Sequence, residues 1–374
     1  MRVLVLLHEA FGGRGGIAKF NRDFLGALCA YPTAREIVAI PRHAPDPIGT
    51  LPARLDYRTD GIGSKPTWLL HVADTVLTSR RFDLIVCGHV NLLPVAAAAR
   101  LLHRAPLGLV IHGIEAWQPT GRQLTDRLTR QVDFFVAVSG YTKARFLSWT
   151  SVDAARGFVL PNAVDLSEFT PGPVDPSLIA RWNLAGKRVL LTLARLEARE
   201  RYKGIDQILD ILPQLISEYP DLVYVIGGDG SDRPRLEAKA RSLSLSGHVV
   251  FTGYVAETEK RDLYRLADVF AMPSRGEGFG IVFLEAMACG SPVVASSVDG
   301  SREAVRDGKL GIMVDPANPT DILTGIRAAL ARPKGIRPEG LDYFDLHRFH
   351  ERVHAILDDV TGRHMTVAVG VRPD

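Results

Sequence analysis

Residues 269–295 read VFAMPSRGEGFGIVFLEAMACGSPVVA and decide the fold. The apolar run Val269–Met272 predicts a short buried strand, and Pro292–Ala295 predicts a second one. Between them, Gly278-Phe279-Gly280 predicts a turn that leads into a helix over Ile281–Cys289. Two strands joined through a helix pair in parallel, because a tight hairpin turn connects only antiparallel strands. The stretch therefore predicts one βαβ unit.

The same alternation of apolar runs, turns and helix-like stretches continues along the chain. Further strands are predicted at Val3–Leu7, Ile37–Ile40, Leu84–Cys87, Leu107–Ile111, Phe134–Val138, Gly157–Leu160, Val189–Leu193, Leu222–Ile226 and Val249–Thr252. Further helices are predicted at Ile17–Leu28, Leu92–Leu102, Tyr141–Trp149, Ile205–Glu218, Arg235–Ser242, Lys260–Ala267 and Thr320–Ala331. Such alternation is typical of parallel sheets with crossover helices. The predicted fold class is α/β, with two doubly wound parallel-sheet domains in tandem.

Length and proline content predict where the two domains meet. A chain of 374 residues exceeds the roughly 250–300 residues at which single cores stop growing. The stretch Thr170–Pro176 contains three prolines and a glycine, which is typical of a connector. We place the join near Phe169, giving domains at 1–168 and 169–345 and a closing segment at 346–374. Residues 363–374 are predicted to be a frayed tail.

Composition favours a globular protein of the cytoplasm. Hydrophobic residues make up 46% of the chain, but no apolar run approaches the roughly 20 residues that span a bilayer. The N-terminus predicts a buried strand rather than a signal peptide. The three cysteines, Cys29, Cys87 and Cys289, lie far apart and lack metal-ligand spacing. A reducing compartment fits this cysteine usage best.

The charge balance argues against nucleic acid as a partner. A net charge of +3 is small for this length. Basic residues do gather between 100 and 130, near His103 and Trp117, namely Arg100, Arg104, Arg122, Arg127 and Arg130. Two interpretations stay open: a surface that contacts anionic membrane lipids, or an ordinary solvated helical face.

Loops after parallel strands are where ligands bind, so the strand ends are searched first. The first strand is followed by Phe11-Gly-Gly-Arg-Gly-Gly-Ile-Ala18, in which Gly15 and Gly16 open a helix. Amides at a helix N-terminus attract phosphate. The loop matches neither a dinucleotide fingerprint nor a P-loop, so a plain tight turn is the alternative.

Two more strand ends in the first half carry polar side chains. His112-Gly113 follows Leu107–Ile111, and Ser139-Gly140 follows the next predicted strand. An imidazole at a strand end is a candidate substrate contact, although a lone histidine is more often part of the core. Ser139 is equally explained as the N-cap of the following helix.

Arg195 ends the first strand of the second half, and Lys203-Gly204 follows after a short loop. Two cations held at a fixed separation suit a diphosphate, because arginine forks two oxygens while lysine supplies a compact charge. A surface ion-pair network with Glu197 and Glu200 is the alternative.

The opening stretch holds two glutamates in different settings. Glu277 lies in the glycine loop, whereas Glu285 lies about one turn into the predicted helix. Carboxylates accept hydrogen bonds from paired sugar hydroxyls, while the glycine amides and the helix N-terminus face phosphate. An ordinary loop acid and helix acid would not explain the glycines and the strand context together.

The ordered series of these motifs resembles the retaining GT-B glycosyltransferases of family 4. The resemblance covers residues 1 to about 330 and rests on the glycine loop, His112-Gly113, Val138-Ser139, Pro161-Asn162-x-Val164-Asp165, Arg195, Lys203-Gly204, Gly227-Gly228-Asp229-Gly230 and Glu277-x7-Glu285. It implies two Rossmann-like domains facing a cleft. The N-terminal domain would bind the acceptor and the C-terminal domain the nucleotide sugar, with a final helix in 341–360 crossing back to the first domain.

The resemblance also implies roles for single residues. Arg195 and Lys203 would neutralise the donor diphosphate, helped by the amides of Gly15 and Gly16. Glu285 would bind the ribose, and His112 would contact the transferred sugar near its anomeric carbon. Glu277 would hold that sugar, and the donor contacts of its loop extend over Gly278, Phe279, Gly280 and Ile281.

The implied reaction is transfer of a mannose- or glucose-type hexose with retention of configuration. The acceptor attacks the face that the nucleotide leaves, the leaving phosphate takes the proton, and no metal or other cofactor is needed. Co-substrates would be a GDP- or UDP-sugar and a glycan, lipid-linked or small-molecule acceptor, in the synthesis of surface polysaccharide, lipopolysaccharide or glycolipid. The alternatives are a catalytically idle scaffold or nucleotide-sugar-binding module, an isomerase and a phosphorylase.

The sequence departs from the family pattern beyond the sugar pocket. Where the family commonly has Gly-Gly-x-Pro-Glu, this chain reads Asp299-Gly-Ser-Arg-Glu303. The extra charges leave the donor preference open. The loop before Lys203 likewise leaves open whether Arg199 or Arg201 shares the phosphate role.

Overall fold

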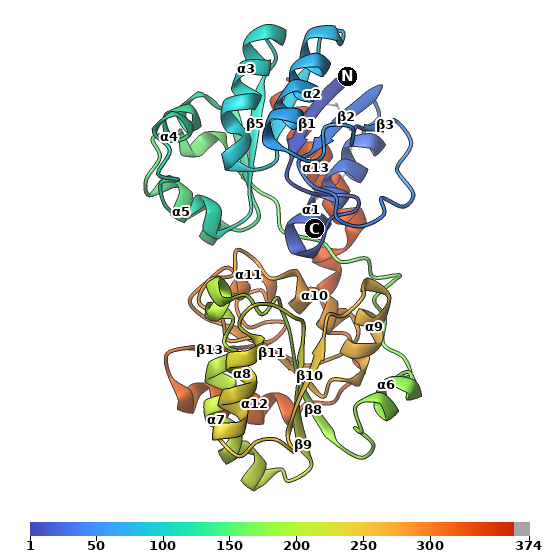
Figure 1. The fold of residues 1–374 in the computed structure, drawn as a ribbon, viewed down its shortest axis with the longest axis vertical. Coiled ribbons are helices and arrows are strands. Elements are labelled where there is room, and N and C mark those ends of the chain that lie inside the picture. The colour runs from blue at the N-terminus through green and yellow to red at the C-terminus, as the bar shows by residue number, and fades with distance from the viewer. Residues whose placement is uncertain (363–374) are drawn as a thin grey trace, which may run out of the picture. The chain divides into compact units, whose positions relative to one another are not determined.

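The computed structural model describes residues 1–362 and divides into two compact units. Among the described residues, the first unit comprises 1–137, 145–160 and 347–362, and the second comprises Val138–Ala144 and Pro161–Leu346. Each unit is a parallel sheet covered by helices, as Figure 1 shows. The predicted fold class, two Rossmann-like α/β domains, is confirmed. The predicted tail at 363–374 lies outside the described residues.

The first unit contains a sheet of order β3-β2-β1-β4-β5-β6-β7. All its pairings are parallel. The strands are β1 (Arg2–Leu7), β2 (Glu36–Pro41), β3 (Leu55–Tyr57), β4 (Leu84–Cys87), β5 (Leu107–Ile111), β6 (Phe134–Ala137) and β7 (Gly157–Val159). The helices are α1 (Gly15–Ala30), α2 (Lys65–Thr78), α3 (Leu93–His103), α4 (Gln123–Leu128) and α5 (Gly140–Leu147), whose first residues belong to the second unit.

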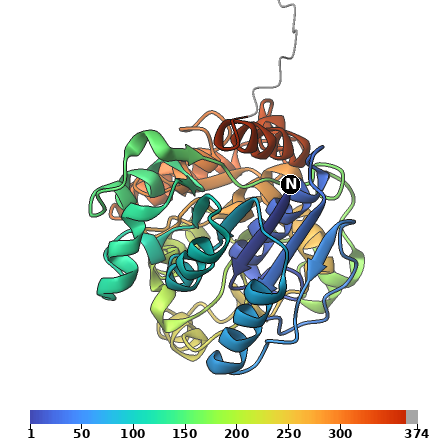
Figure 2. The same cartoon turned by 90° about the horizontal axis from the view of Figure 1, so that it is seen from above.

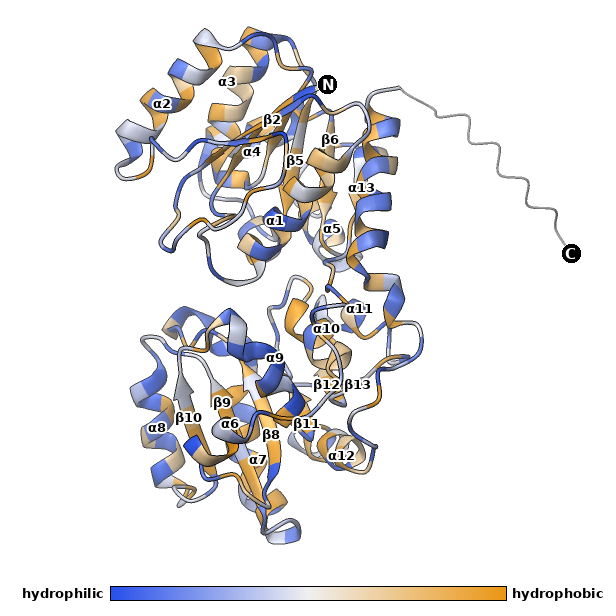
Figure 3. Ribbon diagram, turned by 90° about the vertical axis from the view of Figure 1, so that its right-hand side faces the viewer, coloured by the Kyte–Doolittle hydropathy of each residue, from blue (hydrophilic) through white to orange (hydrophobic). Residues whose placement is uncertain are grey.

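The second unit repeats the plan with a sheet of order β10-β9-β8-β11-β12-β13. Its strands are β8 (Arg188–Leu193), β9 (Leu222–Gly227), β10 (Val249–Gly253), β11 (Val269–Ala271), β12 (Val293–Ser296) and β13 (Ile312–Val314). Its helices are α6 (Pro176–Arg181), α7 (Ile205–Glu218), α8 (Arg233–Ser242), α9 (Glu257–Leu266), α10 (Ile281–Ala288), α11 (Ser301–Ala304) and α12 (Pro319–Leu330). Figure 3 shows the apolar strands in orange and the more polar α8 and α9 largely in blue.

Short 3-10 turns complete the element order. They are η1 (Val90–Leu92), η2 (Ile114–Ala116), η3 (Thr129–Gln131), η4 (Ala154–Arg156), η5 (Ala198–Lys203) and η6 (Leu341–Phe344). Of these, η5 connects the end of β8 to the start of α7 and carries the charged residues Glu200 and Lys203.

The last described helix, α13 (Leu346–Val360), packs on α1 of the first unit. The ring of Phe349 lies edge-on against Phe20 with 5.5 Å between ring centroids. His354 Nε2 hydrogen bonds the Ala27 carbonyl at 2.9 Å, and the Tyr31 hydroxyl donates to Asp358 at 2.6 Å. The helix is drawn in dark red in Figure 2. Its apolar face therefore completes the core of a unit whose other strands and helices lie before residue 161.

The elements that the sequence did not predict are mostly short. Strands β3 and β13 have three residues each and lie at sheet edges. Helices α4, α6 and α11 have four to six residues, too few to show a helical period. The unpredicted α2 is longer, and it does carry a start signal, since Ser64 caps it and Pro66 occupies its first turn.

Candidate functional site

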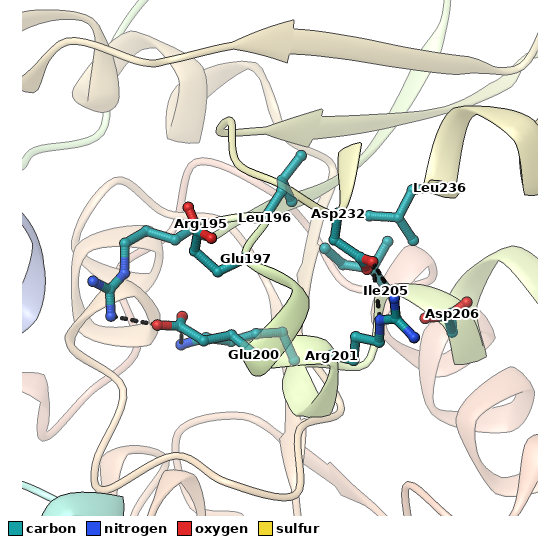
Figure 4. A pocket seen from close by; sticks show the side chains of 10 residues that line it. Arg195, Leu196, Glu197, Glu200, Arg201, Ile205, Asp206, Asp232 and Leu236 are labelled. Atoms are coloured by element: carbon teal, nitrogen blue, oxygen red, sulfur yellow. Dashed lines mark hydrogen bonds and ion pairs between the residues drawn. The ribbon is translucent and has the colours of Figure 1, made fainter. Parts of the chain in front are cut away.

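A cavity opens beside the end of β8 in the second unit (Figure 4). Its lining mixes opposite charges with a few apolar side chains, namely Arg195, Leu196, Glu197, Glu200, Arg201, Lys203, Ile205, Asp206, Asp232 and Leu236. The residues come from the end of β8, from η5 and from the starts of α7 and α8. This is the carboxyl edge of the parallel sheet, where α/β folds bind ligands.

Four charged side chains of this edge form a chain of ion pairs. Lys203 Nζ lies 2.5 Å from Glu277 Oε1 and 3.8 Å from Glu200 Oε2. The other oxygen of Glu200, Oε1, pairs with the Arg195 guanidinium at 2.5 Å. The fold thus brings together three of the residues named from the sequence, Arg195, Lys203 and Glu277. The predicted ion pairing of Arg195 with Glu200 is present in the same place.

Lys203 is held by the turn that follows it. Gly204 has a φ of +85°, and a Cβ at this position would lie 2.4 Å from the Pro273 carbonyl oxygen. Only glycine adopts this backbone without strain, which explains the Lys203-Gly204 pair in the sequence. Burial acts to lower the pKa of Lys203, but the neighbouring Glu277, Tyr202 and Glu200 raise it above its ordinary value. Lys203 is therefore a permanent cation.

The loop that carries Glu277 is fixed by a buried carboxylate that the sequence analysis did not assign. Asp299 has no exposed surface and accepts hydrogen bonds from the Glu277 amide at 2.9 Å and the Ser274 hydroxyl at 2.5 Å. Its second oxygen accepts from the Ser301 hydroxyl at 2.6 Å. Burial raises the pKa of Asp299. Asp299, which stands where the family commonly has glycine, therefore holds the Glu277 loop in place.

The glycine loop itself has a backbone that side chains would disturb. Gly280 has a φ of +88°, and a Cβ there would lie 2.6 Å from the ring of Phe283. Phe279 is 2% exposed and packs edge-on against Phe344. Ile281, the first residue of α10, is also buried. The loop is therefore anchored on both sides of its tightest turn.

Residues Val138–Ala144 also contact this loop inside the second unit. The Ser139 hydroxyl donates to the Gly278 carbonyl at 2.6 Å and accepts from the Thr142 amide at 3.0 Å. The capping role expected for Ser139 is thus present, together with a contact to the glycine loop at Gly278. Glu303 accepts from the amides of Gly140 and Tyr141 at 2.8 Å each.

Glu285 lies on the inner side of α10. Its side chain is buried, and Oε2 accepts a 2.7 Å hydrogen bond from the Tyr264 hydroxyl of α9. Burial and the nearby Glu285 carboxylate together raise the pKa of Tyr264 well above its ordinary value. Tyr264 is therefore a donor that fixes the Glu285 carboxylate, a contact no local sequence pattern signals.

The remaining predicted residues belong to the first unit. Gly15 and Gly16 are exposed at the N-terminus of α1, and Gly15 has a φ of +80°. Arg14, just before them, forms an ion pair with Asp46. Among the residues of α1, the first turn carries no acidic side chain. The amide of Arg14, the residue that precedes the helix, donates to the Glu9 carboxylate at 3.1 Å, so an acidic side chain lies at this N-terminus.

His112 follows β5 and is 8% exposed. Its Nε2 lies 3.0 Å from the Gly88 carbonyl oxygen, which only accepts, so Nε2 carries the proton and Nδ1 is the acceptor. Burial lowers the pKa of His112, which keeps the imidazole neutral. A neutral ring with a free acceptor suits a hydroxyl group.

Two more histidines lie at the same sheet edge, and sequence reasoning missed them. His8 follows β1 and His89 follows β4, with 4.2 Å between their ring centroids. Burial, followed by neighbouring histidine rings and one arginine each, lowers the pKa of His8 to about 4 and that of His89 to about 3. Their positions directly after strands were the available signal.

No group of three or more histidine, cysteine, aspartate or glutamate side chains within residues 1–362 is placed to hold a metal ion. In the second unit, Arg195 and Lys203 stand at one sheet edge, and Lys203 pairs with Glu277, the residue directly before the Gly278–Gly280 turn. Cations of this kind can neutralise and position a diphosphate.

The fold and this edge define a GT-B glycosyltransferase, and comparison with known proteins gives the family. Residues 177–339 match the family model of glycosyl transferases group 1, and residues 15–168 match that of glycosyltransferase family 4. The chain belongs to glycosyltransferase family 4. The resemblance inferred from the motifs is thereby confirmed.

Two curated relatives cover most of the chain. A GDP-mannose-dependent alpha-(1-6)-phosphatidylinositol monomannoside mannosyltransferase of Mycolicibacterium smegmatis is 33% identical over 341 residues, 86% of this chain and 87% of its own length. A D-inositol 3-phosphate glycosyltransferase of Kineococcus radiotolerans is 32% identical and covers 81% of this chain and 66% of its own length.

Solved structures agree on the fold. HepE of Anabaena, crystallised with UDP and glucose, superposes with a TM-score of 0.76 at 22% identity, over 95% of this chain and 99% of its own. Sucrose-phosphate synthase of Thermosynechococcus elongatus gives a TM-score of 0.79 at 20% identity, over 97% and 100%. In residues 1–362, none of the helices has the length and apolar character that crossing a membrane requires.

We predict that Gly280→Ala lowers both stability and nucleotide binding. A residue with a Cβ in the left-handed conformation costs about 1–2 kcal/mol, and the added carbon meets the Phe283 ring. Urea unfolding and calorimetric titration with GDP and UDP measure the two effects. Gly247→Ala is the matched control, because Gly247 has open space around its Cβ position. Unchanged nucleotide binding in Gly280→Ala would contradict the role of this loop.

Proposed function

We propose that the protein transfers mannose from GDP-mannose, with retention of configuration, to an acceptor that contains inositol and phosphate. The observation that carries the proposal is the pairing of Arg195 and Lys203 with carboxylates at the carboxyl edge of the second sheet. The relatives support the substrates, since their names specify GDP-mannose, phosphatidylinositol monomannoside and inositol phosphate.

In this proposal the second unit binds the donor. Arg195 and Lys203 take the diphosphate, whose negative charge grows as the glycosidic bond breaks, so their attraction is strongest in the transition state. Glu277 exchanges its contact with Lys203 for sugar hydroxyls, together with the backbone from Gly278 to Ile281. Glu285, oriented by Tyr264, accepts from the ribose hydroxyls. Gly15 and Gly16 add amides toward the phosphates.

The first unit supplies His112 and the acceptor site. Because its Nε2–H already donates to Gly88, His112 presents Nδ1 to a hydroxyl of the transferred sugar. Its neutral ring does not act as an acid at physiological pH, which agrees with a positioning role. No free carboxylate is needed as a base when the leaving phosphate accepts the acceptor proton.

The same contacts support retention and independence of metal ions as part of the proposal. Glu277 pairs with Lys203, and Glu285 is buried against Tyr264. Both carboxylates therefore already have partners, which favours a binding role over a role as acid or base. Two cations placed on the leaving group supply the charge that a divalent ion supplies elsewhere. The family resemblance supports the same front-face reaction.

The exposed face of α2, α3 and α4 supports membrane contact in this unit. Four large leucines stand out from α2 and α3, where Leu70, Leu77, Leu101 and Leu102 are 72%, 71%, 79% and 62% exposed. The helices α2 and α3 lie side by side (Figures 1 and 3). Arg104, Arg122, Arg127 and Arg130 are exposed nearby in the chain, whereas His103 and Trp117 are buried and contribute nothing to this surface.

Exposed leucines and exposed arginines in the same part of the chain suit an anionic lipid surface, because apolar side chains enter the interface while cations contact headgroups. A lipid acceptor would be presented at that surface. We therefore propose that the protein works at the cytoplasmic face of a membrane and binds it peripherally through this face.

The activity is tested with purified protein, GDP-mannose and phosphatidylinositol monomannoside. We expect a product heavier by one mannose, detected by mass spectrometry. Lys203→Ala and Glu277→Ala should each lower kcat/KM at least about 100-fold, the usual effect of losing a transition-state contact. Lys334→Ala is the control, since this lysine contacts Leu266 and Asp268. Nucleotide binding without transfer from any of a panel of GDP-, UDP- and ADP-sugars would favour a binding module instead.

The metal-independent, retaining reaction is tested by chelation. We expect the transfer rate to be the same with excess EDTA as with Mg²⁺, because Arg195 and Lys203 stabilise the leaving diphosphate. Proton NMR of the first product should show the anomeric configuration of the donor. An absolute requirement for Mg²⁺ or Mn²⁺, or an inverted product, would refute this reaction.

Membrane contact is tested by sedimentation with lipid vesicles. We expect binding to phosphatidylcholine vesicles that contain phosphatidylinositol, weaker binding to phosphatidylcholine alone, and loss of binding in 0.5–1 M salt, roughly, where charges are screened. The double variant Leu70→Ser, Leu101→Ser should bind less. Ile336→Ser, 62% exposed in the second unit, is the control. Equal binding by both variants would rule out this face.

A further inference from the structure

Glu200 is a carboxylate in the proposed diphosphate site that the proposed reaction does not use. It lies in η5, and its side chain is 14% exposed. It lines the cavity at the end of β8 together with Arg195 and Lys203. Figure 4 shows its carboxylate directed toward the Arg195 guanidinium.

The contacts of Glu200 are with the two cations. Oε1 pairs with Arg195 at 2.5 Å, and Oε2 lies 3.8 Å from Lys203 Nζ. Oε2 is buried and has no hydrogen-bond partner. A buried carboxylate oxygen without a donor is unfavourable, so the cations are what keep this side chain in place.

The neighbouring Glu197 shows that this arrangement is particular to Glu200. Glu197 lines the same cavity, but its carboxylate accepts a 2.7 Å hydrogen bond from the Ser231 hydroxyl. Asp232 also lines it and accepts from Arg201 and Arg235. These two carboxylates are therefore held by partners other than Arg195 and Lys203.

Charge balance defines what a diphosphate meets here. Arg195 and Lys203 carry two positive charges, and Glu200 and Glu277 carry two negative ones. In the proposed function Glu277 turns to sugar hydroxyls, but Glu200 has no such second partner on the ligand. An incoming diphosphate and the Glu200 carboxylate then compete for the same guanidinium and ammonium groups. The two anions also repel each other, and this repulsion is strong in a partly buried site.

We propose that Glu200 is a resident counter-anion that the donor diphosphate displaces on binding and that returns when the nucleotide leaves. The proposal rests on the proposed function of this site. It makes Glu200 a positioning residue: it holds Arg195 and Lys203 ready in the empty site, weakens the binding of nucleotide diphosphates and speeds their release. The enzyme would thus bind the nucleotide diphosphate less tightly and release it faster in each catalytic cycle.

The decisive variant is Glu200→Gln, which removes the charge and keeps the shape. We expect its Kd for GDP, UDP and inorganic pyrophosphate, measured by calorimetry, to fall roughly tenfold, the equivalent of one charge-assisted contact that no longer has to be broken. In turnover, the KM for donor should fall, and kcat should fall too if nucleotide release limits the rate. Glu200→Asp keeps the charge and should bind close to wild type.

Glu237→Gln is the matched control, because it also removes one carboxylate from an arginine ion pair, at 2.7 Å from Arg233, but outside the cavity. Circular dichroism checks the fold, and Glu200→Ala replaces the glutamine variant if that variant unfolds. Unchanged or weaker pyrophosphate binding in the folded Glu200 variant, or equal tightening in Glu200→Asp or Glu237→Gln, would overturn the proposal.

Lys203→Ala separates this result from the fate of the proposed function. If Lys203→Ala does not weaken pyrophosphate binding, the diphosphate site itself is wrong, and both proposals fall. If Lys203→Ala weakens binding while Glu200→Gln leaves it unchanged, the site stands and only the counter-anion proposal falls. Tighter binding in Glu200→Gln together with weaker binding in Lys203→Ala supports both.

Discussion

The parallel pairing of β8 with a neighbour on each side is the constraint on which the site depends. In the second sheet, β8 lies between β9 and β11, and the strand order reverses at the β8–β11 pair. Loops that leave two adjacent parallel strands toward opposite faces open a crevice at the carboxyl edge. The loop after β8 carries Arg195 and Lys203, and the loop after β11 carries Glu277. Strand order alone therefore brings Lys203 to Glu277, 74 residues further along the chain.

Much of this was predictable from the sequence. The strand and helix that flank Glu277 follow from the apolar run at 269–272 and the period of 281–289, because both are local signals. What local patterns cannot predict is which partner a charged side chain finds across the sheet. Asp299 was recognised only as an extra charge beyond the sugar pocket, yet it is buried under the Glu277 loop. The contact of Glu285 with Tyr264 was invisible for the same reason.

Buried and partly buried carboxylates of the second unit differ in the kind of partner that holds them. Asp299 is enclosed by hydroxyl and amide donors, so it acts as a permanent brace for the loop. Glu277 and Glu200 are held by the cations Lys203 and Arg195, so in the proposed function these contacts are exchanged when the diphosphate binds. Burial alone does not distinguish a structural carboxylate from one that exchanges its contacts. The partners do: backbone and hydroxyl groups hold the first kind, whereas the second kind pairs with cations for which a diphosphate would compete.

Helix α13 has a consequence for how the protein is made. The second unit is continuous in sequence apart from Val138–Ala144, so it can form its sheet as soon as residue 346 has left the ribosome. Most of the first unit is synthesised earlier but lacks Phe349, the partner of Phe20, until α13 emerges. During synthesis the first unit therefore exposes an apolar surface on α1 until α13 covers it. A ribosome that stalls before α13 would release a chain with one finished unit and one that is prone to aggregate.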